Sequence, residues 1–143
     1  MTSSLGVTLK DQGLYNESWD ILGQIYVPKH VSETSFSWHA TIPAGSFVPL
    51  HYHETQDEFI YMLEGRLEFV LDGKDIAAGS GDLVSLPMRI PHSIHNRSNA
   101  PARCLFWVSP TRALYEYFNK INNMTDTVEM TRLAALHEVP FVV

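Results

Sequence analysis

The stretch from Gly45 to Gly65 reads GSFVPLHYHETQDEFIYMLEG, and it decides both the fold and the chemistry expected of this chain. Two histidines one residue apart, His51 and His53, are followed five positions later by Glu58. Successive side chains of a β-strand point to opposite faces, so the two imidazoles share one face. The apolar run at 59–63 predicts a returning strand. Such a hairpin would bring Glu58 close to both imidazoles, and three side chains of these types suit a divalent metal ion.

A fourth candidate ligand lies further along, in the stretch from Gly81 to Asn96, which reads GDLVSLPMRIPHSIHN. His92 in this stretch follows Pro91 and precedes another short strand. We expect its imidazole to complete the ligand set.

The two stretches together resemble the two sequence motifs of the cupin superfamily. The first motif is a glycine, five residues, H-x-H, four residues, a glutamate, six residues and a glycine, and this chain matches every fixed position. The second motif is matched at four positions: Gly81, Pro87, His92 and Asn96. Arg89 departs from it, because the family usually has a glycine there, and this puts the geometry of the turn before His92 in question.

The resemblance implies that one metal ion is held inside a small β-barrel by His51, His53, Glu58 and His92. Nitrogen-rich ligation suits iron, manganese, nickel, cobalt, copper or zinc as the divalent ion, and the sequence does not choose among them. Gln56 is the nearest substitute donor if Glu58 is not a ligand. His39 and His95 lie on strands near the ligand segments, and strand parity turns His95 away from His92.

Turn chemistry independently predicts an antiparallel β-sandwich or barrel. Many short apolar runs are separated by Gly, Pro and Asp, and Asp72-Gly73 is a strong two-residue hairpin signal. We expect one or two strands within 14–27 and further strands at 36–42, 59–63, 66–71, 74–78, 83–86, 92–96 and 103–109. The predicted fold is therefore all-β, a single-domain antiparallel jelly-roll barrel of the cupin type, with its core at about 34–109.

The remaining segment, about 110–143, is predicted to be a helical tail within the same 1–143 domain. Ser109-Pro110 is a typical helix start, with serine as the cap and proline in the first position. Apolar residues then recur at helical spacing and form one stripe: Leu114, Tyr117, Phe118 and Ile121. Met130, Leu133 and either Leu136 or His137 indicate a second, shorter helix.

Composition narrows the class of protein. Of the 143 residues 45% are hydrophobic, which indicates a folded chain, and no apolar run approaches the roughly 18 residues of a membrane span. A net charge of −6 argues against nucleic acid or an anionic membrane as partner. Cys104 is the one cysteine, and the segment Met1–Leu5 has no export signal, so we expect a cytoplasmic protein.

Two predicted strands, 59–63 and 104–108, are apolar on both faces, so both faces must be covered. One face would line the barrel, and the other would meet the N-terminal strands, the C-terminal helix or a second subunit. We therefore predict a homodimer.

The resemblance to quercetin dioxygenase-like cupins implies an oxidoreductase, with a metal-dependent dioxygenase acting on a small aromatic or enol substrate as the leading hypothesis. Glu58 would be the catalytic base as well as a ligand. The predicted substrate pocket is apolar and contains Ile60, Met62, Ile94 and Phe106. Two alternatives stay open: a metal-dependent isomerase, decarboxylase or lyase, and a metal-stabilised barrel that binds a small molecule without catalysis.

Overall fold

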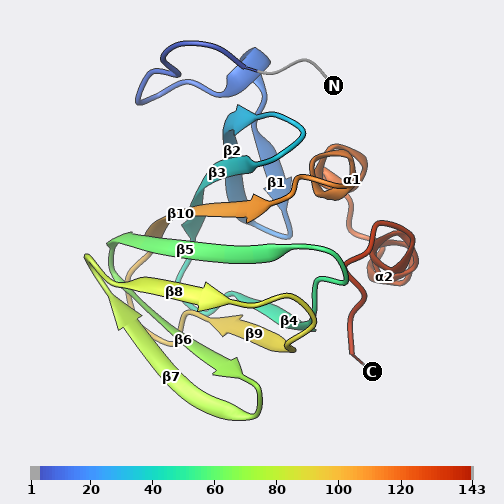
Figure 1. Ribbon diagram of the computed structural model, residues 1–143. Coiled ribbons are helices and arrows are strands. Elements are labelled where there is room, and N and C mark those ends of the chain that lie inside the picture. The colour runs from blue at the N-terminus through green and yellow to red at the C-terminus, as the bar shows by residue number, and fades with distance from the viewer. Residues whose placement is uncertain (1–3, 143) are drawn as a thin grey trace.

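The computed structural model describes residues 4–142, and Met1–Ser3 and Val143 lie outside the described residues. The expectation that the protein is not exported rests partly on Met1–Ser3, so that part of it also lies outside the described residues. Ten strands are followed by two helices (Figure 1). The elements are a 3-10 turn η1 (Leu14–Asn16), strands β1 (Trp19–Ile21), β2 (Gln24–Val31), β3 (Phe36–Ile42), β4 (Phe47–His51), β5 (Asp57–Glu64), β6 (Arg66–Leu71), β7 (Lys74–Gly79), β8 (Leu83–Leu86), β9 (His92–His95) and β10 (Ala102–Ser109), and helices α1 (Leu114–Ile121) and α2 (Thr127–Leu136).

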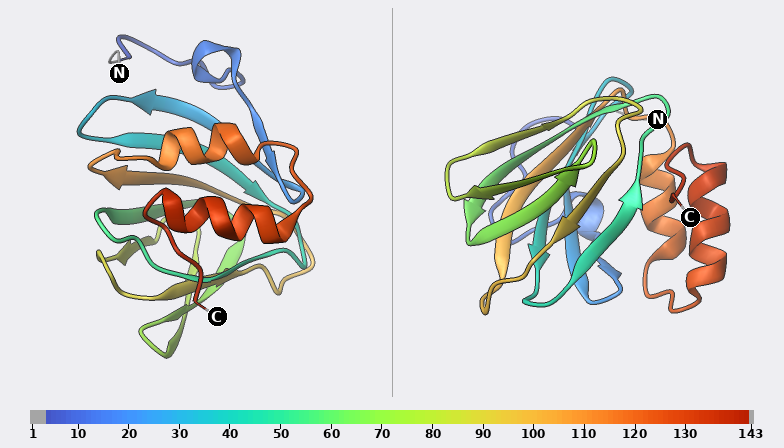
Figure 2. Two further views of the ribbon diagram at one scale, coloured as in Figure 1. Left: turned by 90° about the vertical axis from the view of Figure 1, so that its right-hand side faces the viewer. Right: turned by 90° about the horizontal axis from the view of Figure 1, so that it is seen from below.

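The strands form two antiparallel sheets that face each other (Figures 1 and 2). The larger sheet has the order β1-β2-β3-β10-β5-β8, and the smaller has the order β4-β9-β6-β7. The sheets do not close into one continuous hydrogen-bonded ring, but this is the jelly-roll arrangement that the turn pattern predicts, and the all-β prediction is confirmed.

The pairing register explains how distant parts of the sequence reach one place. His51 at the end of β4 pairs with His92 at the start of β9, in the smaller sheet. Glu58, near the start of β5, pairs with Leu86 of β8 and Val108 of β10, in the larger sheet. The two motifs therefore meet between the sheets.

The hydrophobic core contains residues from both sheets and from both helices. Buried and half-buried residues alternate along β3, as the period-2 pattern of a one-sided strand requires, and every second residue of the neighbouring β10 is also buried. The indole of Trp38 stacks on the ring of Phe36 at a centroid distance of 4.8 Å and on that of Phe106 at 5.1 Å. One hydrophobic cluster runs from Trp19 in β1 to Val139 after α2. The barrel and the tail thus share a core.

A motif glycine fixes the turn between β5 and β6. Gly65 has φ of +82°, in the left-handed region, and a β-carbon there would lie 2.8 Å from the carbonyl oxygen of Pro101. Only a residue without a side chain fits this position.

The predicted helix start at Ser109-Pro110 is wrong, because α1 begins at Leu114. Ser109 is the last residue of β10, and its hydroxyl donates to the carbonyl of Thr34. Thr111 donates its backbone N–H to Glu33 and its hydroxyl to Ser32. These bonds to the β2–β3 connection hold the chain outside a helix until Ala113.

The helical stripe itself is confirmed. Leu114, Tyr117, Phe118 and Ile121 are the buried residues of α1. Helix α2 begins at Thr127, directly after the cap Asp126, whose carboxylate accepts from the backbone N–H groups of Val128 and Glu129. Of the two alternatives at its end, His137 is buried and Leu136 is 65% exposed. Both helices lie on the same side of the barrel (Figure 2).

Among residues 4–142, no helix is long and apolar enough to cross a membrane.

Candidate metal centre

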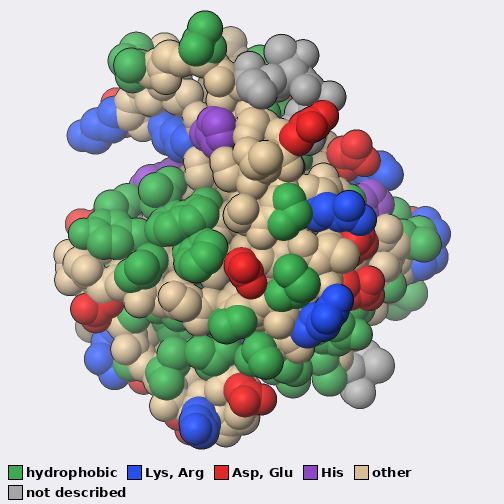
Figure 3. Space-filling model, viewed as in Figure 1, with side chains coloured by type: hydrophobic (Ala, Val, Ile, Leu, Met, Phe, Trp, Pro, Cys, Tyr) green, Lys and Arg blue, Asp and Glu red, His purple; other side chains and the backbone are tan. Residues whose placement is uncertain are grey.

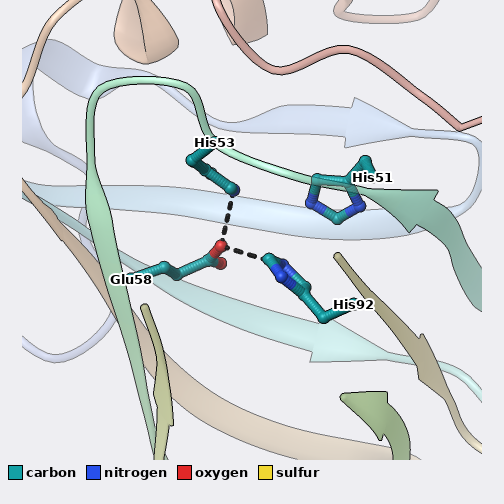
Figure 4. A group of neighbouring side chains, drawn as sticks. All are labelled: His51, His53, Glu58 and His92. Carbon is teal, nitrogen blue, oxygen red and sulfur yellow. Dashed lines mark ion pairs between the residues drawn. The ribbon is translucent and has the colours of Figure 1, made fainter. Parts of the chain in front are cut away.

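The four side chains that the motifs single out lie together between the sheets (Figure 4). His51 ends β4, His53 lies two residues beyond it, Glu58 belongs to β5 and His92 begins β9. One donor atom from each side chain lies within 4.8 Å of those of the other three, and all four residues are buried. The geometry therefore forms a cluster that could hold a metal ion.

The carboxylate of Glu58 is the point on which the cluster converges. Its Oε2 atom lies 2.7 Å from Nε2 of His53 and 3.3 Å from Nε2 of His92. Despite this closeness, none of these three atoms has a hydrogen bond of normal angular geometry to any described residue. Buried polar atoms are rarely left unpaired, because desolvating them is costly, so these atoms fit a bound cation.

The outer nitrogen of each imidazole fixes which nitrogen faces the centre. Nδ1 of His51 lies 2.8 Å from the carbonyl of Pro49, and Nδ1 of His92 lies 3.2 Å from the carbonyl of Ile90. Nδ1 of His53 lies 2.7 Å from the amide oxygen of Gln56. These oxygens only accept, so each Nδ1 carries the proton, and in the neutral ring Nε2 presents a lone pair to the centre. The residues fit a metal ion in tautomer as well as in position.

Electrostatics in the metal-free cluster favour a positive charge at its centre. Burial and the neighbouring histidines lower the pKa of His51 to about 3. Burial lowers the pKa of His53 too, but the nearby, negatively charged carboxylate of Glu58 outweighs burial and raises that pKa overall. Burial would raise the pKa of Glu58, yet His53 and His92 outweigh it and hold it well below its ordinary value. One buried carboxylate thus stays ionised among imidazoles, and a divalent cation can compensate it.

Gln56, the predicted substitute donor, holds His53 in place. Its amide oxygen accepts from His53, while its amide nitrogen donates to the carbonyls of Pro110 (3.1 Å) and Thr111 (2.7 Å). All its polar atoms are committed to these partners. This side chain orients a candidate ligand, and it ties the cluster to the segment before α1.

Arg89 takes the backbone conformation that the usual motif glycine would take. Its φ is +66°, in the left-handed region, and its N–H donates to the carbonyl of His53 at 2.8 Å. The arginine therefore holds the left-handed conformation that glycine adopts most readily, and its hydrogen bond links the two motifs directly.

An apolar cavity of about 100 Å³ adjoins the cluster and includes His51, His53 and Glu58 in its lining. Of the four predicted pocket residues, Ile94 and Phe106 line it. Ile60 and Met62 do not. Both are completely buried in the core, and neither is among the residues that line this cavity.

Sequence reasoning missed most of the cavity wall. Tyr26 and Trp38 come from β2 and β3, Phe118 from α1, and Val139 and Phe141 from the segment after α2. The apolar stripe of α1 was the available signal, since it needed a partner surface, but its spacing did not reveal which surface.

The segment after α2 closes one side of the site. The backbone N–H groups of Tyr52 and Glu54 donate to the carbonyls of Pro140 and Glu138, at 3.3 and 2.9 Å. Phe141 forms an isolated bridge with His51, and the two rings are 5.9 Å apart. The tail is therefore part of the site, which the sequence alone did not indicate.

The other histidines lie outside the cluster. His30 bonds to the hydroxyls of Ser4 and Ser35. His95 bonds to the hydroxyl of Ser93 and stacks on Phe47, on the opposite face from His92 as its parity predicts. His39 is half-buried and does not belong to the cluster.

A jelly-roll barrel with three imidazoles and a carboxylate at its centre defines a class of small metal-site proteins, and comparison with known proteins gives the family. A family profile described as "Cupin domain" matches residues 38–108, from β3 to β10. The chain belongs to the cupin superfamily.

Individual relatives agree with this assignment. The "Tetracenomycin polyketide synthase protein TcmJ" of Streptomyces glaucescens is 32% identical over 87 residues, which are 60% of this chain and 58% of that protein. The "Quercetin 2,3-dioxygenase" of Bacillus subtilis is 40% identical over 55 residues, 38% of this chain and 16% of the enzyme. The chain thus spans less than two thirds of either relative.

Among solved structures, an "RmlC-like cupin" from Shewanella frigidimarina superposes with a TM-score of 0.71 over 80% of this chain and 99% of that chain. The sequences are 19% identical, so this likeness supports the fold alone.

Proposed function

We propose that this chain is a single-domain, metal-dependent cupin enzyme, and that it is a dioxygenase acting on a small aromatic or enol substrate. His51, His53, Glu58 and His92 would be the ligands of one divalent transition metal ion. The observation that carries the proposal is the set of buried, unpaired donor atoms of His53, Glu58 and His92, with His53 and Glu58 in the wall of an apolar cavity.

The donor set leaves room for substrate. Four protein ligands leave open positions on a six-coordinate ion, and the adjoining cavity is where a ligand on those positions would lie. A redox-active ion, when bound, supplies the electron transfer that dioxygen chemistry needs. An ion coordinated only by protein groups would need further donors. Among residues 4–142, no other His, Cys, Asp or Glu belongs to the cluster.

Glu58 is the residue suited to moving a proton. Its carboxylate is held ionised by His53 and His92, so it can accept the proton of a substrate hydroxyl that reaches the site. The apolar wall, including Phe106 and Phe118, excludes water and packs against a flat ring. Substrate binding and proton removal are thereby assigned to groups of this chain.

The comparisons support this choice of chemistry. One relative is a quercetin 2,3-dioxygenase, and another is a tetracenomycin polyketide synthase protein. The two similarities cover 60% and 38% of this chain, so the substrate is proposed as a class.

The test is metal analysis followed by oxygen uptake. Protein loaded separately with Fe(II), Mn(II), Ni(II), Co(II) or Cu(II) is given a panel of flavonols and one-ring enols under air. We expect uptake with at least one ion, and a loss of about 100-fold or more in Glu58→Gln. Glu129→Gln, at a partly exposed glutamate of α2 outside the cluster, is the matched control and should keep full uptake.

Uptake with none of the redox ions would overturn the dioxygenase assignment. Turnover of an enol with zinc bound and no oxygen consumed would instead support the isomerase, decarboxylase or lyase alternative.

We also propose a homodimer through the outer face of the larger sheet. Tyr61, Leu63 and Leu83 are 40%, 45% and 55% exposed there, and Phe59 stacks on Trp107 beside them at 5.3 Å. Figure 3 shows hydrophobic side chains gathered over β10, β5 and β8. Contiguous apolar surface of this kind is typical of interaction sites.

Size measurement by light scattering checks the dimer. We expect a mass of two chains at micromolar concentration and a monomer for Leu83→Glu. Leu136→Glu, at an exposed leucine of α2, is the control and should stay dimeric. A monomeric wild-type protein would refute the dimer.

A further inference from the structure

One buried polar atom outside the metal cluster also lacks a partner. Among the described residues, the buried side-chain atoms without a hydrogen bond are three atoms of the cluster and Nε1 of Trp38. Trp38 is 2% exposed, so solvent at the surface does not serve this N–H group. Its side chain lines the same cavity as His51, His53 and Glu58.

The indole of Trp19 is a buried N–H group outside the cavity wall, and it serves as a comparison for Trp38. Trp19 is also 2% exposed, and its Nε1 donates to the amide oxygen of Asn119 at 3.0 Å. Buried tryptophans usually find such a partner, because an indole N–H can only donate and leaving it unpaired is costly. Trp38 lacks such a partner, and it lines the cavity in which a ligand is expected.

Neighbouring rings prevent Trp38 from turning to find another acceptor. Phe36 and Phe106 stack on it, with interplanar angles of 28° and 20°, and Phe118 meets it edge-on at 5.1 Å. The orientation of the N–H group is therefore set by packing before any ligand arrives. A preorganised donor costs little to engage.

The other polar side chains of the cavity wall are already committed. The hydroxyl of Tyr26 donates to Gln24 at 2.7 Å, and Gln24 donates to the carbonyl of Phe47 at 3.0 Å. The hydroxyl of Tyr117 donates to the carbonyl of Met130 at 3.1 Å. The uncommitted polar groups of the wall are thus the metal cluster and Trp38.

We propose that Trp38 is a specificity-determining residue whose indole N–H donates a hydrogen bond to a ligand oxygen. The inference rests on the proposed function, because it requires a ligand with one oxygen at the metal centre and a second oxygen directed to Trp38. The cavity of about 100 Å³ is no larger than the cavity of roughly 150 Å³ that binds benzene, so it takes at most one aromatic ring. The ligand class is therefore a one-ring aromatic or enol compound with two oxygen functions.

The test uses zinc-loaded protein, which can bind such ligands without oxidising them, under anaerobic conditions. The probes are catechol, resorcinol and hydroquinone, whose two hydroxyls are adjacent, meta and para, with phenol as the one-oxygen control. The readout is the indole N–H region of a proton–nitrogen NMR spectrum of protein labelled at tryptophan. Spectra of Trp19→Phe and Trp107→Phe assign the Trp38 signal by elimination even if Trp38→Phe does not fold.

We expect at least one dihydroxybenzene to shift the Trp38 proton downfield, as a new hydrogen bond requires, and to bind at least about fivefold more tightly than phenol. In Trp38→Phe that advantage over phenol should vanish, while bound zinc stays at one ion per chain. Trp107→Phe, on the outer face of the sheet, should bind the probes like wild-type protein.

Binding of a dihydroxybenzene with an unmoved Trp38 signal would overturn the assignment of the donor. Failure of all three probes to bind the zinc-loaded protein would overturn the ligand class. A chain that retains no zinc would instead overturn the proposed metal site, so the two failures are distinguishable by metal analysis.

Discussion

Two regions of this molecule bury histidine, and they bury it in different ways. At the end of α2, His137 is 7% exposed and uses both ring nitrogens, one to the carbonyl of Leu133 and the other to the amine of Lys120. Between the sheets, His53 and His92 are buried as completely but use only Nδ1, and their Nε2 atoms have no hydrogen bond. Burial alone therefore does not mark a site. The unpaired nitrogen does.

The contrast has a structural origin. Near the helix end, free backbone carbonyls are available, so an imidazole can be satisfied by its own neighbourhood. Between two sheets, most backbone groups are committed to the ladders, so the side-chain atoms that face the centre must satisfy one another or bind something else. This difference leads to four predictions.

The largest effect is expected for His53→Ala. This variant should lose more than about 100-fold in metal affinity. Removing a residue that only hydrogen-bonds to a ligand already costs about 10- to 100-fold, and removing the ligand itself should cost more. The fold should persist, since the hydrophobic core does not depend on this imidazole. Competition with a chelator measures the affinity, and circular dichroism checks the fold. Stoichiometric metal that resists the chelator in this variant would contradict the ligand assignment.

A somewhat smaller effect is expected for Gln56→Ala. The amide of Gln56 orients His53 without facing the centre, so its loss should lower metal affinity by about 10- to 100-fold and leave the stoichiometry at saturation unchanged. The same chelator titration measures it. A metal affinity equal to that of wild-type protein would show that Gln56 does not position His53 for metal binding.

The metal-free protein should become less stable as the pH falls from 6.5 towards 3. The pKa of His51 is about 3 in the folded chain, so the unfolded chain binds more protons than the folded chain over this range. The unfolding free energy therefore increases as the pH rises. Glu58 acts in the same direction, because its folded pKa is lowered, whereas His53 opposes it.

His51→Asn isolates the contribution of His51 to this pH dependence. The difference in unfolding free energy between wild type and variant should change by about 1 kcal/mol per pH unit within that range. Urea titrations at a series of pH values measure it. Parallel pH profiles of the two proteins would show that His51 is not held neutral by the fold.

The smallest effect is expected for His137→Ala. The variant loses two hydrogen bonds at the end of α2, so unfolding free energy should fall by about 1–2 kcal/mol. Metal affinity should not change, which makes it the matched control for His53→Ala. Loss of metal binding in this variant would mean that the two histidine environments are coupled, and the contrast between them would no longer hold.

Features that depend on neighbouring residues in the sequence were predicted correctly, and features that depend on distant residues were not. The strands 66–71 and 83–86 are observed with those bounds, because hairpin chemistry at Asp72-Gly73 and the Gly81 turn set them locally. The helix start at Ser109 was predicted wrongly because bonds from Thr111 to the distant Glu33 and Ser32 outweigh the local cap signal. Tertiary partners decide such ends, and the sequence does not show them.

The candidate site divides in the same way. Motif spacing pointed to His51, His53, Glu58 and His92, which the structure brings together, because parity and turn length act over a few residues. Strand parity put Ile60 and Met62 on the inner face correctly but could not tell core from cavity wall. The distinction depends on where α1 and the tail pack.

By itself, the sequence determined the alternation of strands and turns, the family and the four clustered side chains, since each rests on spacing along one chain. Only the tertiary structure decided that His137 is satisfied, that Gln56 supports His53, and that Trp38 keeps an unpaired N–H beside the cavity. These facts depend on contacts between residues far apart in sequence, and a hydrogen bond exists only when two groups meet at the right distance and angle.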